Sequence, residues 1–542
     1  ESASGGAGAT LGSITASEGT FTQSGDFVFG SGASVGAISA NGTVRFQDDG
    51  DILLGSGASL ASVTSVSANI DFEGDIIIGS GASIGAVSAE KGVVFDNVVT
   101  LRLDAGLAEG ASIDGGSGGV AFNDPLTLSE GAVVGNVLGS GAISFNAIDG
   151  SGNGAIGSIT SHANGISQTG NLTLGSGGAI GALEGSGTIV LLNGGSDDFL
   201  LGSGASLASI SSLYGSITVG GSGVLASGAS IGGIAADEDV TFSGPMVLKA
   251  GAEIASGGAI DSFSGAVTFA ETLTLFPNAM IGDIAASGAV LFGNEVDIGA
   301  NASIGSIFSS GSTITFTNTL EMAAGASVSE IDAKGAVSFK DIDASGSSVS
   351  IGNIESRSGA VTLSGNLTLG NGGTIGTIIG SGSVKIGKDG ASLSLESGAA
   401  ISGITASHGS LSFDQDLSLG SGASIGDLFA AEGVTFVGTV DLESGATLGS
   451  GNTIDGGSGG VTFSNTLSLE EGAKVGNIVG SGAISFQAID GSGNGQIGSI
   501  ISEHSGITQN GDLTLGSGGA IGNLTAEGRI LIGVGTSTET VL

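Results

Sequence analysis

Short runs of alternating apolar and polar residues recur along the whole chain, and small glycine-rich segments separate them. Residues 75–95 read DIIIGSGASIGAVSAEKGVVF, and residues 416–436 read DLSLGSGASIGDLFAAEGVTF. The first phrase predicts three short β-strands, at 75–78, 83–87 and 93–95. Each run is too short to bury an apolar face by itself. We therefore expect each strand to pair with its counterpart in the next phrase.

The spacing of the phrases indicates how they are arranged. Phe72 and Phe95 end successive phrases and stand 23 residues apart. A near-constant phrase length favours stacked coils over hairpins of varied length. We expect an all-β fold: one long parallel β-solenoid (β-helix) with about three short strands per coil of roughly 23–24 residues, running through residues 1–542 as one continuous domain. A large antiparallel sandwich or barrel is the alternative.

A second, longer repeat lies above the short one. The segment IDGGSGGVAFNDPLTLSEGAVVGNVLGSGAISF begins at Ile113, and IDGGSGGVTFSNTLSLEEGAKVGNIVGSGAISF begins at Ile454, an offset of 341 residues. Weaker matching extends to the N-terminus, so residues 1–185 recur at about 341–525. Residues 186–340 repeat the short phrase but have no second long copy. The longer polar intervals at 146–168, 341–357 and 487–509 predict lateral loops or enlarged coils.

Composition supports stacked coils with tight corners. The chain has 108 glycines and three prolines. Glycine adopts the positive φ angles of tight corners without steric cost, whereas proline would remove a donor from an interior strand. A single Tyr and no Trp predict a narrow interior that takes one aliphatic or phenyl layer per coil.

The charge balance excludes several kinds of partner. Eleven Lys and Arg stand against 51 Asp and Glu, a formal net charge of −40. Nucleic acid binding requires clustered cations, and here they are scattered singly. An anionic membrane would repel such a surface. The sequence also has no run of about 20 apolar residues, so it predicts no membrane-spanning helix. The absence of cysteine excludes disulfides and thiol chemistry.

One motif has the spacing of a calcium ligand set. Asp149, Ser151 and Asn153 precede Gly154, and Asp490, Ser492 and Asn494 repeat the pattern. The spacing matches the first half of an EF-hand loop, with oxygen ligands at positions one, three and five and glycine at six. Position twelve, where a bidentate Glu belongs, is Thr160 or Ile501. Calcium is therefore the one cofactor candidate, and a polar glycine-rich turn is the alternative.

Catalytic constellations are weak in this sequence. The adjacent acids Asp48–Asp49 and Asp197–Asp198 could be nominated for sugar hydrolysis, but such pairs are typical of solvated corners. Lys385 and Lys388 near Asp389 are the one pair of cations beside an acid. His162, His408 and His504 are expected at the surface. We predict that the chain is not an enzyme, and a polysaccharide-active β-helix is the alternative.

With its LGSGASIGAVSA coils followed by GVVF, the chain resembles the β-solenoid shafts of secreted bacterial surface proteins, of the filamentous-haemagglutinin and autotransporter-passenger type. The resemblance spans the full length and rests on period and composition. It implies export, exposure at the cell surface, and a role in adhesion or matrix formation. It supplies no functional residue.

These features lead to a functional hypothesis. We expect a rigid, acidic, extracellular structural protein that builds a fibre, sheath or surface layer by stacking end to end on other copies of itself. Cell-surface or matrix polysaccharide is a further expected partner. The alternative is the stalk of an adhesin whose binding head lies outside this sequence.

Overall fold

The computed structural model describes residues 2–47, 50–150, 152–192, 197–387 and 392–533, almost wholly as β-strands. The only helix in these ranges is one 3₁₀ turn, η1 (Gly457–Gly459). The chain divides into two compact units. Unit 1 comprises Glu1–Glu271 and Ala279–Gly282, and unit 2 comprises Thr272–Asn278 and Asp283–Leu542. The prediction of one continuous domain concerns how the two units join and stays a prediction.

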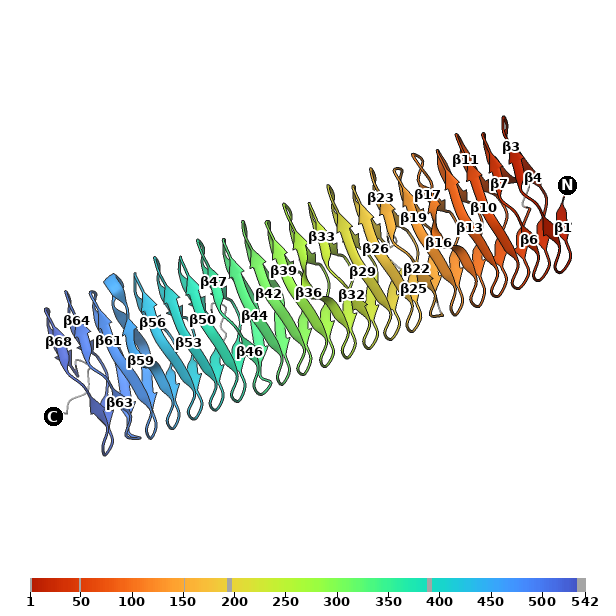
Figure 1. Ribbon diagram of the computed structural model, residues 1–542. Helices are drawn as coiled ribbons and strands as arrows, with labels where there is room; N and C mark the ends of the chain where they lie inside the picture. The colour runs from red at the N-terminus through yellow and green to blue at the C-terminus, as the bar shows by residue number, and fades with distance from the viewer. Residues whose placement is uncertain (1, 48–49, 151, 193–196, 388–391, 534–542) are drawn as a thin grey trace. The chain divides into compact units, whose positions relative to one another are not determined.

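A typical coil of unit 1 contains three strands that run around a narrow core (Figure 1). They are β11 (Asn69–Phe72), β12 (Ile76–Ile78) and β13 (Ser83–Ala89). The next coil supplies β14 (Gly92–Phe95), β15 (Val99–Leu101) and β16 (Gly106–Asp114). Each strand pairs in parallel with its counterpart one coil on, as in Phe72 with Phe95 and Ile76 with Val99.

Unit 2 repeats this arrangement. Its strands β55 (Leu417–Leu419), β56 (Ser424–Ala430) and β57 (Val434–Phe436) correspond to those of the unit 1 coil. They pair in parallel with β58 (Val440–Leu442), β59 (Thr447–Asp455) and β60 (Val461–Leu469). The predicted parallel β-solenoid with about three strands per coil is therefore confirmed.

The core of each unit consists of ladders of identical or similar side chains. Phe46, Phe72, Phe95, Phe122 and Phe145 follow one another in unit 1, with ring centroids 4.4–5.3 Å apart and nearly parallel planes. All five are buried. Phe413, Phe436, Phe463 and Phe486 form the same row in unit 2. This is the single phenyl layer per coil that the composition predicts.

Glycine is required where a corner turns or where two coils come close. Gly57, in the corner before β10 (Ser59–Ser65), has a φ of +67° that other residues rarely adopt. Gly85 lies within β13, and a Cβ atom there would stand 2.0 Å from the carbonyl oxygen of Ala61 in the preceding coil. A side chain at this position would push the coils apart.

The polar interval 146–168 is not a lateral loop, which corrects the sequence expectation. It holds β21 (Ile148–Gly150), β22 (Ala155–Ile156), β23 (Ile159–Ser161) and β24 (Ile166–Gln168). The intervals 341–357 and 487–509 likewise form strands. Small polar residues occupy the outward positions, whereas isoleucines such as Ile148 and Ile159 point inward and are buried. The backbone thus makes an ordinary coil.

The true enlargements are bulges within long strands. In β13, Val87 follows Ile84 by three residues. Their partners in β16, Leu107 and Ile113, are six residues apart. Three extra residues are thereby accommodated without loss of pairing on either side. The same shift separates β56 from β59 in unit 2.

Candidate functional site

The first predicted calcium motif lies at a coil corner of unit 1. Asp149 is an exposed residue of β21, and its register neighbours are Thr127 and Thr173 in the adjacent coils. The Oδ1 atom of Asn153 accepts a hydrogen bond from the Gly131 N–H at 2.6 Å. Ser151 lies outside the described residues. The Asn153 oxygen therefore fastens the corner to the preceding coil.

The second copy of the motif shows how the turn is held. The Oδ1 atom of Asp490 accepts the N–H of Ser492 at 3.1 Å, an Asx-type turn. Asn494 has a φ of +71°, the left-handed conformation that Asn tolerates. Asp490 stands on β62 (Ile484–Gly491) between Ser468 and Thr514 of the neighbouring coils. The Asp490 carboxylate thus contacts the backbone N–H of Ser492, and Asn494 occupies the left-handed position at which the chain turns.

An open surface groove of about 520 Å³ includes Asp149. Its lining comprises Val98, Pro125, Thr127, Ala147, Ile148, Asp149, Asn171 and Thr173. Hydroxyl groups and one carboxylate thus face solvent beside apolar atoms. Within the described ranges, no three His, Cys, Asp or Glu residues are placed to hold one metal ion together. The calcium hypothesis stays a prediction.

A row of carboxylates lies on the outward face of unit 2. Asp297, Glu321 and Asp343 are register neighbours on the outward positions of β41 (Val296–Ile298), β43 (Ile314–Met322) and β45 (Val337–Ala344). Partial burial, followed by the charges of Asp297, Glu295 and Asp343, raises the pKa of Glu321. Burial and the charge of Glu295 likewise raise the pKa of Asp297. Periodicity alone did not reveal this row.

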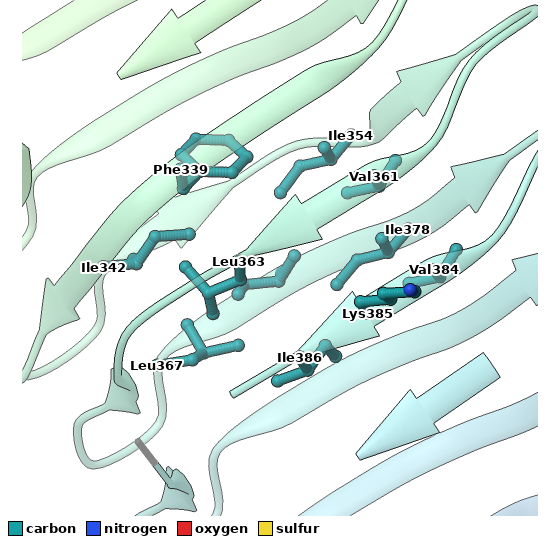
Figure 2. A pocket seen from close by; sticks show the side chains of 11 residues that line it. Phe339, Ile342, Ile354, Val361, Leu363, Leu367, Ile378, Val384, Lys385 and Ile386 are labelled. Atoms are coloured by element: carbon teal, nitrogen blue, oxygen red, sulfur yellow. The ribbon is translucent and has the colours of Figure 1, made fainter. Parts of the chain in front are cut away.

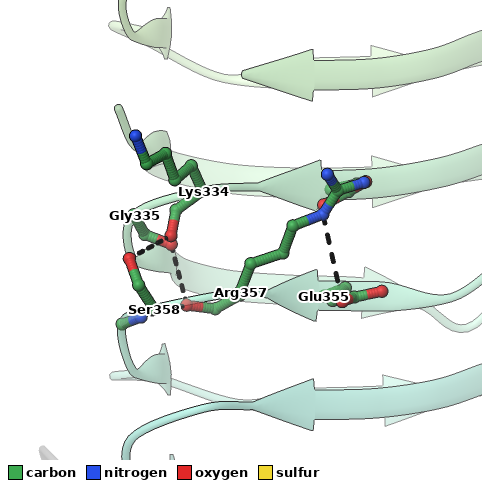
Figure 3. A network of polar contacts seen from close by, with 8 residues as sticks. Lys334, Gly335, Glu355, Arg357 and Ser358 are labelled. Atoms are coloured by element: carbon green, nitrogen blue, oxygen red, sulfur yellow. Dashed lines mark hydrogen bonds and ion pairs between the residues drawn. The ribbon is translucent and has the colours of Figure 1, made fainter. Parts of the chain in front are cut away.

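A polar network joins three coils of unit 2 and was also missed from the sequence (Figure 3). Arg357 forms an ion pair with Asp332 one coil earlier and lies 4.0 Å from a carboxylate oxygen of Glu355. Its guanidinium carbon lies 5.5 Å from the ring centre of Phe308, two coils earlier. Asp332 is only 7 % exposed, and its Oδ1 atom has no hydrogen-bond partner. Arg357 thus covers a nearly buried carboxylate.

The backbone beside Arg357 fixes this geometry. The Ser358 N–H and hydroxyl both donate to the carbonyl oxygen of Lys334, at 2.8 and 2.5 Å. The network therefore follows from corner stacking as well as from charge. The sequence signal is indirect: Glu355 is the register neighbour of Asp332 one coil on, and Arg357 stands two residues beyond Glu355. The exact length of each corner must be known before this spacing can be used.

A small cavity interrupts the core of unit 2 (Figure 2). It has a volume of about 20 Å³, room for about one water molecule. Its lining is apolar apart from Lys385, and includes Phe339, Leu363 and Ile386. These three residues follow one another in register in one core row. The cavity therefore lies where the phenyl row gives way to smaller aliphatic side chains.

The remaining candidates from the sequence are dispersed. His162, His408 and His504 are exposed as predicted. A hydrogen bond between His504 Nδ1 and the accepting Oε2 of Glu527, 3.2 Å apart, raises the pKa of His504. Asp198 lies on β28 (Asp198–Leu201), where its N–H donates to Asn171 Oδ1, and Asp197 accepts a hydrogen bond from the Ser222 N–H through its carbonyl. Asp48, Asp49, Lys388 and Asp389 lie outside the described residues.

Across the described ranges, no helix has both the length and the apolar character that a membrane crossing requires. Comparison with known proteins adds no further assignment. No protein-family model, no curated protein and no solved structure matches the chain.

Proposed function

We propose that the chain is a non-enzymatic structural protein of the cell exterior, an acidic β-solenoid that builds a fibre, sheath or surface layer by end-to-end stacking. The observation that carries this proposal is the uniform stacking surface. Away from the bulges, each coil offers its neighbour parallel strands in a constant register and a row of mainly apolar side chains. We infer that a coil from another copy uses that surface in the same way.

The long repeat supports one proposed face for such stacking. Strand β66 (Leu513–Leu515) repeats β25 (Leu172–Leu174) within the long repeat, and β69 (Ile530–Ile532) stands at the same offset of 341 residues from β27 (Ile189–Leu191), just beyond the bounds of that repeat. In the earlier copy, β28 and β30 (Ile217–Val219) cover these strands. Leu174, Ile189 and Leu191 are accordingly at most 1 % exposed.

In the later copy the same side chains face solvent. Leu515, Ile530 and Ile532 are 37 %, 42 % and 51 % exposed. Strands β1 (Ala3–Gly5) and β4 (Phe21–Ser24) pair in parallel within unit 1 with β5 (Phe27–Phe29) and β8 (Val44–Gln47), and in a second copy they would offer matching strands to β66 and β69. We therefore assign them as the partners. Head-to-tail contact of this kind generates an open fibre.

Export to the cell exterior is supported by the resemblance to secreted β-solenoid shafts and by the high net negative charge, which favours solubility. Assignment as a non-enzymatic protein is supported by the dispersal of the acids and histidines along the coils. End-to-end stacking and the lack of catalytic activity are separate parts of the proposal.

Electron microscopy and light scattering of the purified chain test the stacking. We expect fibres one solenoid wide, and their loss in Ile530→Asp/Ile532→Asp, which places charge on the stacking face. Val66→Asp, at a lateral corner that is 62 % exposed, is the matched control and should assemble normally. Single particles of the unaltered chain at high concentration, with and without calcium, would overturn end-to-end assembly and favour the adhesin stalk.

A further inference from the structure

A group of exposed apolar and acidic side chains occupies successive corners of unit 1. We name it the corner patch, and it consists of Leu213, Tyr214, Asp237, Glu238 and Phe263. Leu213, Tyr214 and Phe263 are 59 %, 70 % and 62 % exposed. Their corners follow β29 (Ser206–Ser212), β33 (Ile234–Ala236) and β36 (Glu253–Ser262), all labelled in Figure 1.

Backbone hydrogen bonds stack these corners directly on one another. The Asp237 N–H donates to the Ser212 carbonyl at 3.1 Å, and the Phe263 N–H donates to the Ala236 carbonyl at 2.9 Å. Leu213, Asp237 and Phe263 are therefore equivalent positions in three coils, and Tyr214 and Glu238 are equivalent in the adjacent row. At a strand spacing of about 4.8 Å, the corners of Tyr214 and Phe263 lie about 10 Å apart.

The acids between the two apolar corners are held in place. The Ser216 hydroxyl, next to the Tyr214 corner, donates to Glu238 Oε2 at 3.1 Å. The carboxylate is thereby drawn toward the coil that carries Tyr214. Between residues 184 and 271 the sequence has nine acids and a single cation, Lys249. The corner patch therefore combines aromatic faces with a strongly negative field.

The fold does not require these residues. Equivalent corner positions after β7 (Ile38–Ala40), β13 and β19 (Val133–Gly139) are Asn41, Glu90 and Ser140, so a polar residue suffices to turn the chain. The corner patch lies in residues 186–340, the part without a second long copy. Leu213 and Tyr214 share one corner, and Phe263 lies two coils on, beyond Asp237 and Glu238. Exposed apolar side chains gathered among polar ones in this way mark interaction surfaces.

We propose that the corner patch binds a cationic polysaccharide that contains amino sugars with protonated amines. Aromatic rings stack on the flat apolar faces of sugar rings, and an ammonium group is attracted both by the faces of Tyr and Phe and by nearby carboxylates. Two aromatic corners about two strand spacings apart match an extended polymer rather than a compact ligand. The negative field excludes acidic polysaccharides.

Binding of soluble, partly deacetylated poly-N-acetylglucosamine to the full chain tests this proposal by calorimetry at mildly acidic pH. We expect Tyr214→Ser/Phe263→Ser to weaken binding by about tenfold or more, since two stacking contacts are lost. Val66→Ser, at an equally exposed corner without an aromatic neighbour, should leave the affinity unchanged. Asp237→Asn/Glu238→Gln should weaken binding and reduce its dependence on salt.

Three outcomes would overturn the proposal. The first is that the double aromatic variant binds the polymer as tightly as the chain with an intact corner patch, and the second is that the fully acetylated polymer binds as tightly as the partly deacetylated one. The third is that polylysine binds with the same affinity as the polymer and loses affinity on the same corner substitutions. The last result would assign the corner patch to basic proteins. The measurements use the Ile530→Asp/Ile532→Asp background, so sugar binding is measured per chain. Failure to form fibres and failure to bind sugar are therefore separate results.

Discussion

Gln168 lies opposite Phe145 in the register of two adjacent coils, where it ends a row of stacked phenyl rings in unit 1. Gln509 has the same relationship to Phe486 in unit 2. Gln168 is 1 % exposed, and its Nε2 atom donates to the carbonyl of Gly170 while its buried Oε1 atom has no partner. In Gln509 the Oε1 atom accepts the Gly533 N–H at 3.1 Å. The two amides therefore hold equivalent corners of the two units, but the amide oxygen of Gln509 has a hydrogen-bond donor and that of Gln168 has none.

This difference predicts the effect of an isosteric apolar replacement. Gln168→Leu removes one hydrogen bond but also a buried acceptor without a partner, so we expect a change in the free energy of unfolding of less than about 1 kcal/mol. Gln168→Ala should cost about 2 kcal/mol or more, because it leaves a cavity beside Phe145. Denaturant midpoints of both variants provide the measurement. A large loss in Gln168→Leu would show that the amide holds the corner by itself.

The cavity at the interruption of the phenyl row in unit 2 predicts a stabilising substitution. Leu363→Phe fills the space next to Phe339 and restores a stacked pair, which should raise stability by about 1 kcal/mol. Leu369→Phe is the matched control: Leu369 is fully buried and does not line the cavity. Overpacking there should cost about 1–3 kcal/mol. Equal destabilisation by both changes would mean that the cavity cannot admit a ring.

The carboxylate row predicts that stability depends on pH. The folded-state pKa values of Asp297 and Glu321 are raised above 3.8 and 4.5, so the folded chain holds these protons more tightly than the unfolded chain. Stability from this row is therefore highest below these ordinary values and falls as the pH rises through the raised ones. At neutral pH, Glu321→Gln should stabilise the chain by about 0.5 kcal/mol.

The matched control for the carboxylate row is Glu184→Gln. Glu184 stands between Thr160 and Ser211 in register and has no carboxylate above or below it. Its replacement should leave the pH dependence of the melting temperature unchanged, whereas Glu321→Gln should flatten it. An unchanged slope in Glu321→Gln would show that solvent screens the row completely.

The ion pair of Arg357 and Asp332 predicts strong coupling between two substitutions. Arg357→Met leaves the nearly buried Asp332 carboxylate without its partner and should cost about 3 kcal/mol. Asp332→Leu in addition should recover most of that loss, because no charge then remains uncompensated. Denaturant unfolding of the two single variants and the double variant gives the coupling energy. Additive losses would argue that solvent replaces Arg357 at Asp332.

The repeated phrase was sufficient to predict the strands and the core. In DIIIGSGASIGAV, alternate residues such as Ile76, Ile78 and Ile84 become the inward ladder, because each is constrained by an equivalent residue one coil away. The interval 146–168 was predicted wrongly as a loop or enlarged coil. Its polar residues occupy outward positions, where they do not interfere with strand pairing, and its buried isoleucines keep the ordinary coil. The Arg357 network could not be predicted, because contact across coils depends on the length of each corner. The calcium residues were found by spacing alone, and spacing does not show that Asn153 is already bonded to Gly131.

The bulge in β16 has a consequence for how such a chain tolerates change. Pairing continues at Leu107 and resumes at Ser112 although the intervening residues have no counterparts in the next coil. The ends of the bulge are pinned by neighbours above and below, so the entropy of a longer segment there grows only slowly with its length. The bulge is thus an insertion point: a peptide grafted between Ala108 and Ala111 would be displayed on the side of the solenoid while the coils on either side remain in register.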